Sequence, residues 1–549
     1  MQSSLVFRLT SLLLLAISSS EVLSSERSLQ DECASNENSV IDSISIDIHP
    51  IFDEANPKEN NWLFKTVNYL HINTNESVIR KDLLFKEGDI YDEKLLQQSE
   101  RILRTRRYLN YATIAPQQEC TANQKVKVDV REVWTLVPGA TFSHAGGNSN
   151  YSYGLRDSNF LGLGKTLEVK HTSTSQRTGN LFKYYDPNSG ILNSTVLLQY
   201  ENNSDGIAKS AAFIKPFIAF ETEWSAGISH DQYTQESALY NAGEVANRFA
   251  HNNLNESIFY GIKIDTPNDE TVHRIIAGYN RSQDNFLPIL SPSAPSMLIP
   301  RDREFNYPWA EYQYITDDYV KAHNIQQINR VEDINLGSEI RFRLGYASSR
   351  YSVYDKSFIF DSSYEKGVAL NKNHLLLARV GAGGYYGLGE FYNSKLHAKA
   401  SYHWKNFNRG QFFVGVTAAR GTKLFQDSPF ELGGDTGLRG YPAFYQAGDR
   451  LQLLTIEQRF FGEKEWFSLF HMGAAVFYDE GRAWGESAIP QSQITRLRDI
   501  GVGLRISGTR TGNREEGAHN VLHIDVASPL DGGNDISKFQ WLVKVKKGF

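Results

Sequence analysis

The chain has 549 residues, a net charge of −6 and a mildly polar mean hydropathy. The small acidic excess speaks against a nucleic-acid-binding protein, because such proteins concentrate Lys and Arg on one face. Aromatic residues are abundant, with 28 Tyr, 31 Phe and 8 Trp, although only one long apolar run is present. This combination is typical of a membrane β-barrel with aromatic girdles rather than of a helical membrane protein.

The N-terminus has the pattern of a secretory signal peptide. Arg8 precedes the apolar run Leu9–Ile17, and small residues follow at Ser18–Ser20. This run is too short to span a bilayer as a helix. We therefore predict a signal peptide over residues 1–24 and a short N-terminal segment over 25–40. A buried N-terminal helix is the alternative, although no amphipathic pattern continues it.

Cys33 and Cys120 are the two cysteines of the chain. In an oxidising compartment they could form a disulfide that ties the mature N-terminus to the first domain. Two unpaired thiols are the alternative. The 14 histidines are scattered, and no HExxH or paired Cys/His spacing occurs. We expect no metal and no cofactor.

Residues 41–133 predict one small α+β domain. Ile44, Ile46 and Ile48 alternate with polar residues, which indicates a strand. Two helices follow, a short one at 76–85 and a longer one at 92–107 that Asp92 can cap. Two further strands are expected at 111–114 and 126–133. In this order the helices are expected to cover one face of a small sheet.

Residues 134–549 alternate between apolar and polar side chains almost throughout. In 339–346, for example, Ile340, Phe342 and Leu344 alternate with Glu and Arg. Such strands, apolar on one face only, are typical of an antiparallel transmembrane barrel. A soluble β-sandwich also alternates, but the signal peptide, the aromatic content and the length favour a membrane barrel. The pattern divides into about twenty candidate strands.

A glycine-rich loop at 425–450 interrupts these strands and contains one arginine at its centre. Its motif residues are Gly433, Gly434, Leu438, Arg439, Gly440 and Tyr441. In the two strands that follow, alternation turns Glu457 and Asp479 inward. Because arginine binds carboxylates through paired hydrogen bonds, we expect the loop to fold into the lumen, with Arg439 on Asp479 first and Glu457 second. A solvated arginine on an exposed turn is the alternative.

The last strand alternates in the same way and ends in an aromatic residue. Its apolar positions are Phe539, Trp541, Val543, Val545 and, at the end of the sequence, Phe549. The alternation slips at Lys547, so that Phe549 falls out of phase. Bacterial outer-membrane barrels typically end in this way, and we interpret these residues as a C-terminal assembly signal.

Together these segments resemble the POTRA-plus-barrel superfamily of outer-membrane proteins, the BamA/TamA-like bacterial surface antigen family. The motifs that carry the resemblance are Asp157–Gly164, Leu432–Tyr441, Thr455–Arg459 and Phe477–Gly481. It implies a single POTRA domain at 41–133 and an all-β barrel of about 16 strands at 134–549, in spite of the larger number of candidate segments. It also implies that Gly481 is a lumen partner of Arg439, together with Glu457 and Asp479.

The resemblance implies a non-enzymatic barrel in the bacterial outer membrane, with its POTRA domain in the periplasm. The barrel would assemble, insert or translocate client proteins or lipids. Extended client polypeptides would bind the POTRA sheet edge and the seam between residues 134–144 and 539–549. Outer-membrane lipid and an accessory periplasmic or inner-membrane protein are further expected partners. The alternatives are a secretion pore or passive channel, and a lipid-directed enzyme using inward Asp479, His523 and Asp525.

Overall fold

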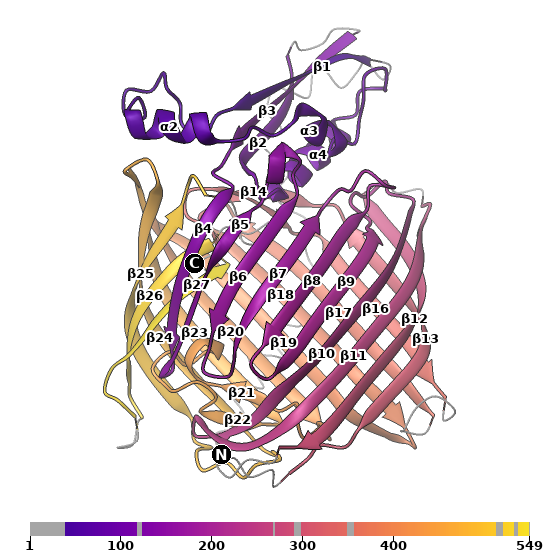
Figure 1. Cartoon of the computed structure of the whole chain (residues 1–549), viewed down its shortest axis with the longest axis vertical. Coiled ribbons are helices and arrows are strands. Elements are labelled where there is room, and N and C mark those ends of the chain that lie inside the picture. The colour runs from indigo at the N-terminus through magenta and orange to yellow at the C-terminus, as the bar shows by residue number, and fades with distance from the viewer. Residues whose placement is uncertain are drawn as a thin grey trace.

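A computed structural model of the chain describes residues 39–117, 123–266, 270–289, 298–348, 356–511, 520–531 and 536–547. Within these residues the chain forms an N-terminal α+β unit and a closed β-barrel. Figure 1 shows the N-terminal unit seated over one mouth of the barrel. The predicted signal peptide, Cys33, Cys120 and Phe549 lie outside the described residues.

The N-terminal unit is a small sheet packed against helices. Its elements are β1 (Val40–His49), α2 (Trp62–Leu70), α3 (Glu76–Lys81), α4 (Glu93–Thr105), β2 (Leu109–Pro116) and β3 (Asn123–Glu132). The sheet order is β1-β3-β2, with β1 parallel and β2 antiparallel to β3. Ile79, Leu96 and Leu103 from the helices are buried against Val128 and Val130 of the central strand. As expected, Asp92 caps α4 by accepting from the Lys94 amide.

Helix α2 is absent from the sequence-based prediction. Its residues include Thr66, Val67 and Asn68, which have weak helix propensity. The helix forms because the Asn61 side chain caps the Phe64 amide at 3.0 Å and because Phe64 stacks on Phe52 with ring centroids 3.9 Å apart. Local capping and tertiary packing therefore outweigh the weak intrinsic preference.

The barrel wall closes with twenty antiparallel strands in the described residues, so the expectation of about 16 is wrong. The wall strands are β4 (Leu136–Ala145), β5 (Asn148–Asp157), β6 (Thr166–Ser173), β7 (Thr178–Asp186), β8 (Thr195–Asn203), β9 (Gly206–Lys215), β10 (Trp224–Asn241), β11 (Glu244–Ile264), β12 (Thr271–Pro288), β13 (Arg303–Thr316), β16 (Ser338–Ala347), β17 (Ser357–Asn371), β18 (His374–Gly387), β19 (Glu390–Phe407), β20 (Gly410–Thr422), β23 (Arg450–Trp466), β24 (Phe470–Trp484), β25 (Leu497–Gly508), β26 (Asn520–Pro529) and β27 (Gln540–Lys547). The alternation itself divides into about twenty segments, and the smaller number was implied by the family resemblance alone.

The two faces of the wall differ in polarity. Outward side chains such as Ile340, Phe342 and Val476 are exposed, whereas inward Asp479 and Arg505 are fully buried. An exposed apolar face is stable only against lipid, so the wall is that of a membrane-spanning barrel. Among the described residues, no helix is long and apolar enough to cross a membrane.

In the longest wall strand, most of the exposed large apolar side chains lie in the half nearer the N-terminal unit. Strand β11 has 21 residues, whereas a crossing needs about 9–11. Exposed Ile258, Tyr260 and Ile262 occupy the part of β11 nearer the N-terminal unit, and the polar run Asn252–Glu256 lies farther away. The long strands therefore continue past the bilayer on the far side.

Two short hairpins lie apart from the wall. One, formed by β14 (Tyr319–His323) and β15 (Val331–Asn335), enters from the mouth under the N-terminal unit. The other, formed by β21 (Phe430–Leu432) and β22 (Gln446–Gly448), lies near the opposite mouth. We call them the proximal hairpin, residues 317–337, and the inward loop, residues 425–450. They bring polar groups from both ends toward the centre of the lumen.

Candidate functional site

The inward loop folds tightly enough to place one arginine in the lumen. Gly433 has φ +135°, and a Cβ there would lie 2.2 Å from the Pro442 carbonyl oxygen. At Gly440 a Cβ would meet the Asp499 side chain at 2.6 Å, which explains why only glycine fits. Leu438 and Tyr441 are buried beneath the loop, and the Tyr441 hydroxyl donates to the Arg498 carbonyl at 2.9 Å.

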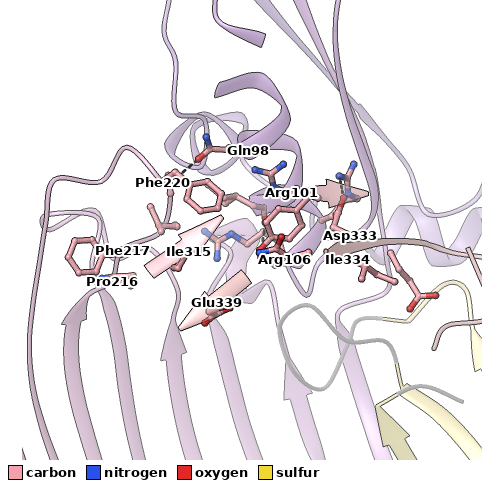
Figure 2. A pocket seen from close by; sticks show the side chains of 18 of the residues that line it. Gln98, Arg101, Arg106, Pro216, Phe217, Phe220, Ile315, Asp333, Ile334 and Glu339 are labelled. Carbon is pink, nitrogen blue, oxygen red and sulfur yellow. Dashed lines mark hydrogen bonds and ion pairs between the residues drawn. The ribbon is translucent and has the colours of Figure 1, made fainter. Parts of the chain in front are cut away.

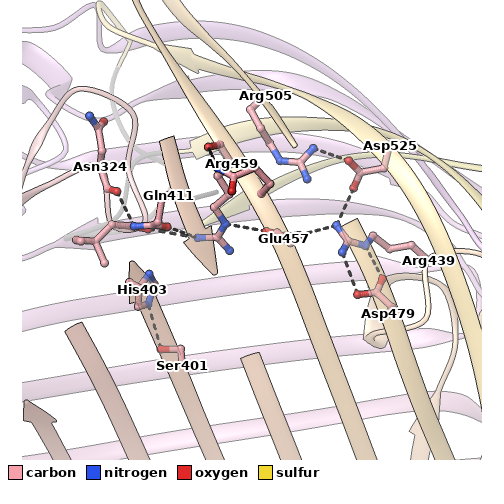
Figure 3. A network of polar contacts seen from close by, with 12 residues as sticks. Asn324, Ser401, His403, Gln411, Arg439, Glu457, Arg459, Asp479, Arg505 and Asp525 are labelled. Carbon is pink, nitrogen blue, oxygen red and sulfur yellow. Dashed lines mark hydrogen bonds and ion pairs between the residues drawn. The ribbon is translucent and has the colours of Figure 1, made fainter. Parts of the chain in front are cut away.

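Arg439 is the centre of the lumen cluster (Figure 3). Its guanidinium binds Asp479 through two hydrogen bonds of 2.7 and 3.0 Å, and it donates to Glu457 at 2.8 Å. Asp525 lies 3.7 Å from the same guanidinium. The structure therefore brings Arg439 together with both carboxylates selected from the sequence, in the order expected, and adds a third.

The surroundings keep Arg439 charged although it is buried. Burial alone would lower the pKa of its guanidinium, but Asp479, Glu457 and Asp525 together raise that pKa above its ordinary value. The guanidinium also lies over the Phe477 ring, 3.4 Å from its centroid. Gly481 is not among these contacts: it packs against Leu432 of the inward loop.

A chain of polar contacts continues from Arg439 to the proximal hairpin. Glu457 also accepts from Arg459 at 2.7 Å. Arg459 in turn donates to the Ile325 carbonyl at 3.3 Å, and Gln411 donates to the Asn324 carbonyl at 2.9 Å. The carbonyls of the hairpin tip thus join the network that holds the inward loop.

Several members of this cluster were not selected from the sequence. Asp499 accepts from the Gly440 amide at 3.0 Å, and Arg505 binds Asp525. Alternation alone places Asp499 and Arg505 on the inward face, but it does not show that their strands meet the loop. Asp525 and His523 are also buried. They were selected only under the enzyme alternative.

The other end of the proximal hairpin is tied to helix α4 of the N-terminal unit. Arg104 binds Asp333 through two hydrogen bonds of 2.7 Å, and Lys321 lies 2.6 Å from Glu100. Burial would raise the pKa of the Glu100 carboxyl, but bonds from Lys321, the Ile114 amide and Arg104 lower it below the ordinary value. These ion pairs hold the hairpin against the N-terminal unit.

A cavity of about 880 Å³ lies at this junction. Figure 2 shows it between α4, the turn that carries Phe217 and Phe220, and the proximal hairpin. Its lining combines aromatic rings with charges of both signs, among them Arg101, Asp333 and Glu339. It is therefore a space where polar and apolar groups of a bound chain would both find partners.

The seam between the first and last wall strands is weakly paired. Among the described residues, β27 and β4 share one paired position, Val543 with His144. By contrast, β26–β27 has eight paired positions and β4–β5 has ten. The Trp541 ring stacks on His144 with centroids 4.0 Å apart, so side chains cover a seam that has few backbone bonds.

Both ends of the seam are braced. At the far mouth, the Ala443 amide of the inward loop donates to the Gly146 carbonyl at 3.0 Å, next to the end of β4. Ile536, just before β27, packs in the same apolar cluster as Leu432. At the near mouth, the Trp134 amide donates to the Arg510 carbonyl at 2.7 Å. At the far mouth, the inward loop therefore contacts the β4 side of the seam through Gly146 and the β27 side through Ile536.

The residues of the expected assembly signal lie along β27 and just before it. Phe539 and Trp541 are exposed on the outer face, and Val543 and Val545 are partly buried. Leu542, on the opposite face, is fully buried. In the part of the chain that the structure describes, no group of three or more His, Cys, Asp or Glu side chains is arranged to hold a metal ion.

Comparisons with known proteins find distant structural likenesses only. No family model and no curated protein matches the chain. BamA from Haemophilus ducreyi lacking POTRA domains 1–3 is 11% identical with a TM-score of 0.38, covering 92% of this chain and 84% of that one. CdiB from Acinetobacter baumannii is 13% identical with a TM-score of 0.42, covering 93% and 73%. CdiB from Escherichia coli is 11% identical with a TM-score of 0.45, covering 93% and 77%.

Proposed function

We propose that this protein is a bacterial outer-membrane barrel that inserts or translocates client polypeptides through its seam. The single paired position between β27 and β4 is the observation that carries the proposal. Strand edges with unpaired backbone groups are unstable in lipid and attract an incoming strand. The neighbouring strand pairs are fully bonded and offer no such edge.

In this mechanism the inward loop controls the seam. Its Ala443 amide binds Gly146 beside β4, while its Leu432 shares a cluster with Ile536 beside β27. Release of Arg439 from Asp479 would free both contacts together. The loop would then stop bracing the seam, and a client strand would pair with the exposed backbone of β27 or β4. No catalytic step is assigned.

The N-terminal unit would serve as a periplasmic POTRA domain that receives the client. Order β1-β3-β2 leaves β1 at one edge of its sheet. Residues 88–91 cover the first half of β1, through Ile41 and Val40. We propose that an extended client adds as a strand along the second half, Ser45–His49. The junction cavity then lies between this edge and the lumen.

The test is a disulfide placed across the seam. His144→Cys with Val543→Cys would lock the paired position, in a background where Cys33 and Cys120 are replaced by Ser. Ile524→Cys with Val543→Cys is the matched control, because it links the same residue to its other neighbour. We expect the seam lock, and not the control, to reduce client proteins in the outer-membrane proteome, with recovery on reduction. Full function of the locked protein would refute lateral insertion.

A secretion pore is the second candidate, and the wall itself favours it. Twenty strands enclose a wide lumen, since barrel diameter grows with strand number. The proximal hairpin and the inward loop occupy that lumen. Deleting residues 319–335 should raise conductance in planar bilayers strongly if a client passes through the lumen. Unchanged conductance would count against the pore.

A further inference from the structure

Helix α2 presents an apolar face that the rest of the N-terminal unit does not cover. Phe64 is buried beneath it, and Val67 packs in the same cluster. The opposite face carries Trp62 and Tyr69, which are 78% and 87% exposed, and Leu70, which is 62% exposed. Large apolar side chains gathered on one exposed helix face mark an interaction surface.

The position of α2 indicates what covers this face. Arg510, in the β25–β26 turn of the barrel, donates to the Ile51 carbonyl at 3.2 Å and to Glu59 at 2.7 Å, just before the helix. The same side chain donates to the Ser468 carbonyl in the β23–β24 turn at 3.2 Å. Figure 1 shows α2 roughly perpendicular to the barrel axis, above one side of this mouth and beyond the ends of the wall strands. The helix is thus fixed to the rim of the barrel.

The rim beside α2 continues the membrane-facing surface of the wall. Phe467, at the tip of the β23–β24 turn, is 74% exposed. Trp466 beside it and Trp404 and Phe407 at the end of β19 are exposed as well. Aromatic side chains at strand ends form the girdle that lies at the lipid headgroups. Trp62 and Tyr69 are exposed residues of the same aromatic type on the N-terminal unit.

The charge of α2 is compatible with a lipid surface. Lys65 is the one charged residue of the helix, and no acidic residue lies in its first turn. Lys65 is exposed and can extend toward headgroup phosphates while its carbon chain stays near the apolar face. An amphipathic helix with Trp, Leu and Lys in this arrangement lies in the interfacial plane of a bilayer.

We propose that α2 inserts its Trp62–Tyr69–Leu70 face into the bilayer leaflet next to the seam, and so anchors the N-terminal unit to the membrane. The location follows from Trp134, which leads into β4 and packs with the residues under α2. The anchor holds the start of β4 at the membrane surface. This inference rests on the fold and the exposed face, not on the proposed insertion function.

The experiment measures lipid contact at one labelled position. In full-length protein with Cys33→Ser and Cys120→Ser, Leu70→Cys carries a fluorophore, and the protein is reconstituted singly into nanodiscs of brominated phosphatidylcholine. Val476→Cys on the wall is the lipid-facing control. Lys125→Cys is the distal control, because it lies near the start of β3, the strand that leads into the barrel.

We expect quenching at position 70 to approach that at 476 and to exceed that at 125 several-fold. Quenching at 70 no greater than at 125 would overturn the proposal, as would a blue shift without quenching, which indicates cover by protein. One copy in each nanodisc removes a second copy as the cover. The seam-locked protein should show the same quenching, so failure of the insertion mechanism and failure of the anchor are distinguished.

Discussion

Replacing Arg439 by Ala should release the inward loop while leaving the wall closed. The cluster has four carboxylates, Asp479, Glu457, Asp499 and Asp525, and three guanidinium groups, Arg439, Arg459 and Arg505. The substitution leaves two guanidinium groups beside four carboxylates, with Lys546 as the other cation that interacts with these charges. It also removes three hydrogen bonds of 2.7–3.0 Å from buried carboxylates.

The magnitude follows from the buried carboxylates that are left behind. Each lost hydrogen bond to a charged group has a net value of about 1.5–3 kcal/mol. The three bonds belong to one guanidinium within one network, so the three values do not add. Removing one partner of a buried ion pair costs about 3–5 kcal/mol. The equilibrium for loop seating should therefore shift by roughly 10²-fold to several thousand-fold.

Hydrogen–deuterium exchange of residues 430–448 measures this shift. The reporters are the Gly434 amide, bound to the Tyr441 carbonyl, and the Ala443 amide, bound to Gly146. Arg450→Ala is the matched control, because its side chain is 47% exposed. Wall amides in β24 should keep their protection in both variants. If Arg439→Ala protects the loop as well as Arg450→Ala does, the cluster does not hold the loop.

The other predictions concern the contacts at both ends of the lumen. Arg104→Ala removes two bonds to Asp333 and should increase exchange in the proximal hairpin, by about 1–3 kcal/mol of lost protection. Burial raises the pKa of Glu431 in the inward loop from 4.5 to about 7. Because the folded pKa is the higher one, stabilisation of the seated loop present at low pH should be lost as the pH rises through 7. Gly146→Ala would place a Cβ 2.0 Å from the Ala443 nitrogen and should displace the loop, as measured by the same exchange.

Each of these predictions has a matched control. Asp333→Asn should loosen the hairpin as Arg104→Ala does, and exchange unchanged in both would contradict the role of the ion pair. Glu431→Gln should remove the pH dependence of loop exchange, and a dependence that persists must come from another group. Gly147 also has positive φ but open space around its Cβ. Gly147→Ala should therefore leave the loop seated, and equal effects at both glycines would indicate backbone strain alone.

Alternation made much of the lumen cluster predictable. In β23 and β24 the period of two fixes which side chains turn inward, and buried charges must then find partners. Arg439 is the central cation of the glycine-rich loop that precedes those strands, so its contact with Asp479 followed from few alternatives. The contact between Arg439 and Asp525 was not predicted from the sequence, because it depends on the register of β26 relative to the neighbouring wall strands.

The proximal hairpin illustrates what the sequence could not show. Tyr319–His323 alternates like a wall strand, whereas Val331–Asn335 does not, and each is only five residues long. Their place inside the mouth is set by Arg104, which lies 229 residues from Asp333 in the chain. Helix α2 was missed for a related reason, since its stability comes from Phe52 and the Asn61 cap. Long-range contacts of this kind leave no local pattern.

The even number of strands has a consequence for how such a barrel can change size. Because β4 begins and β27 ends at the same mouth, the wall is a closed series of antiparallel hairpins. A hairpin duplicated or deleted within β5–β19 would change the circumference and leave each remaining strand running in its original direction. The N-terminal unit, the inward loop and the seam would keep their relative orientation. Lumen width can therefore diverge among descendants of one ancestral barrel while the parts that act at its two mouths stay in place.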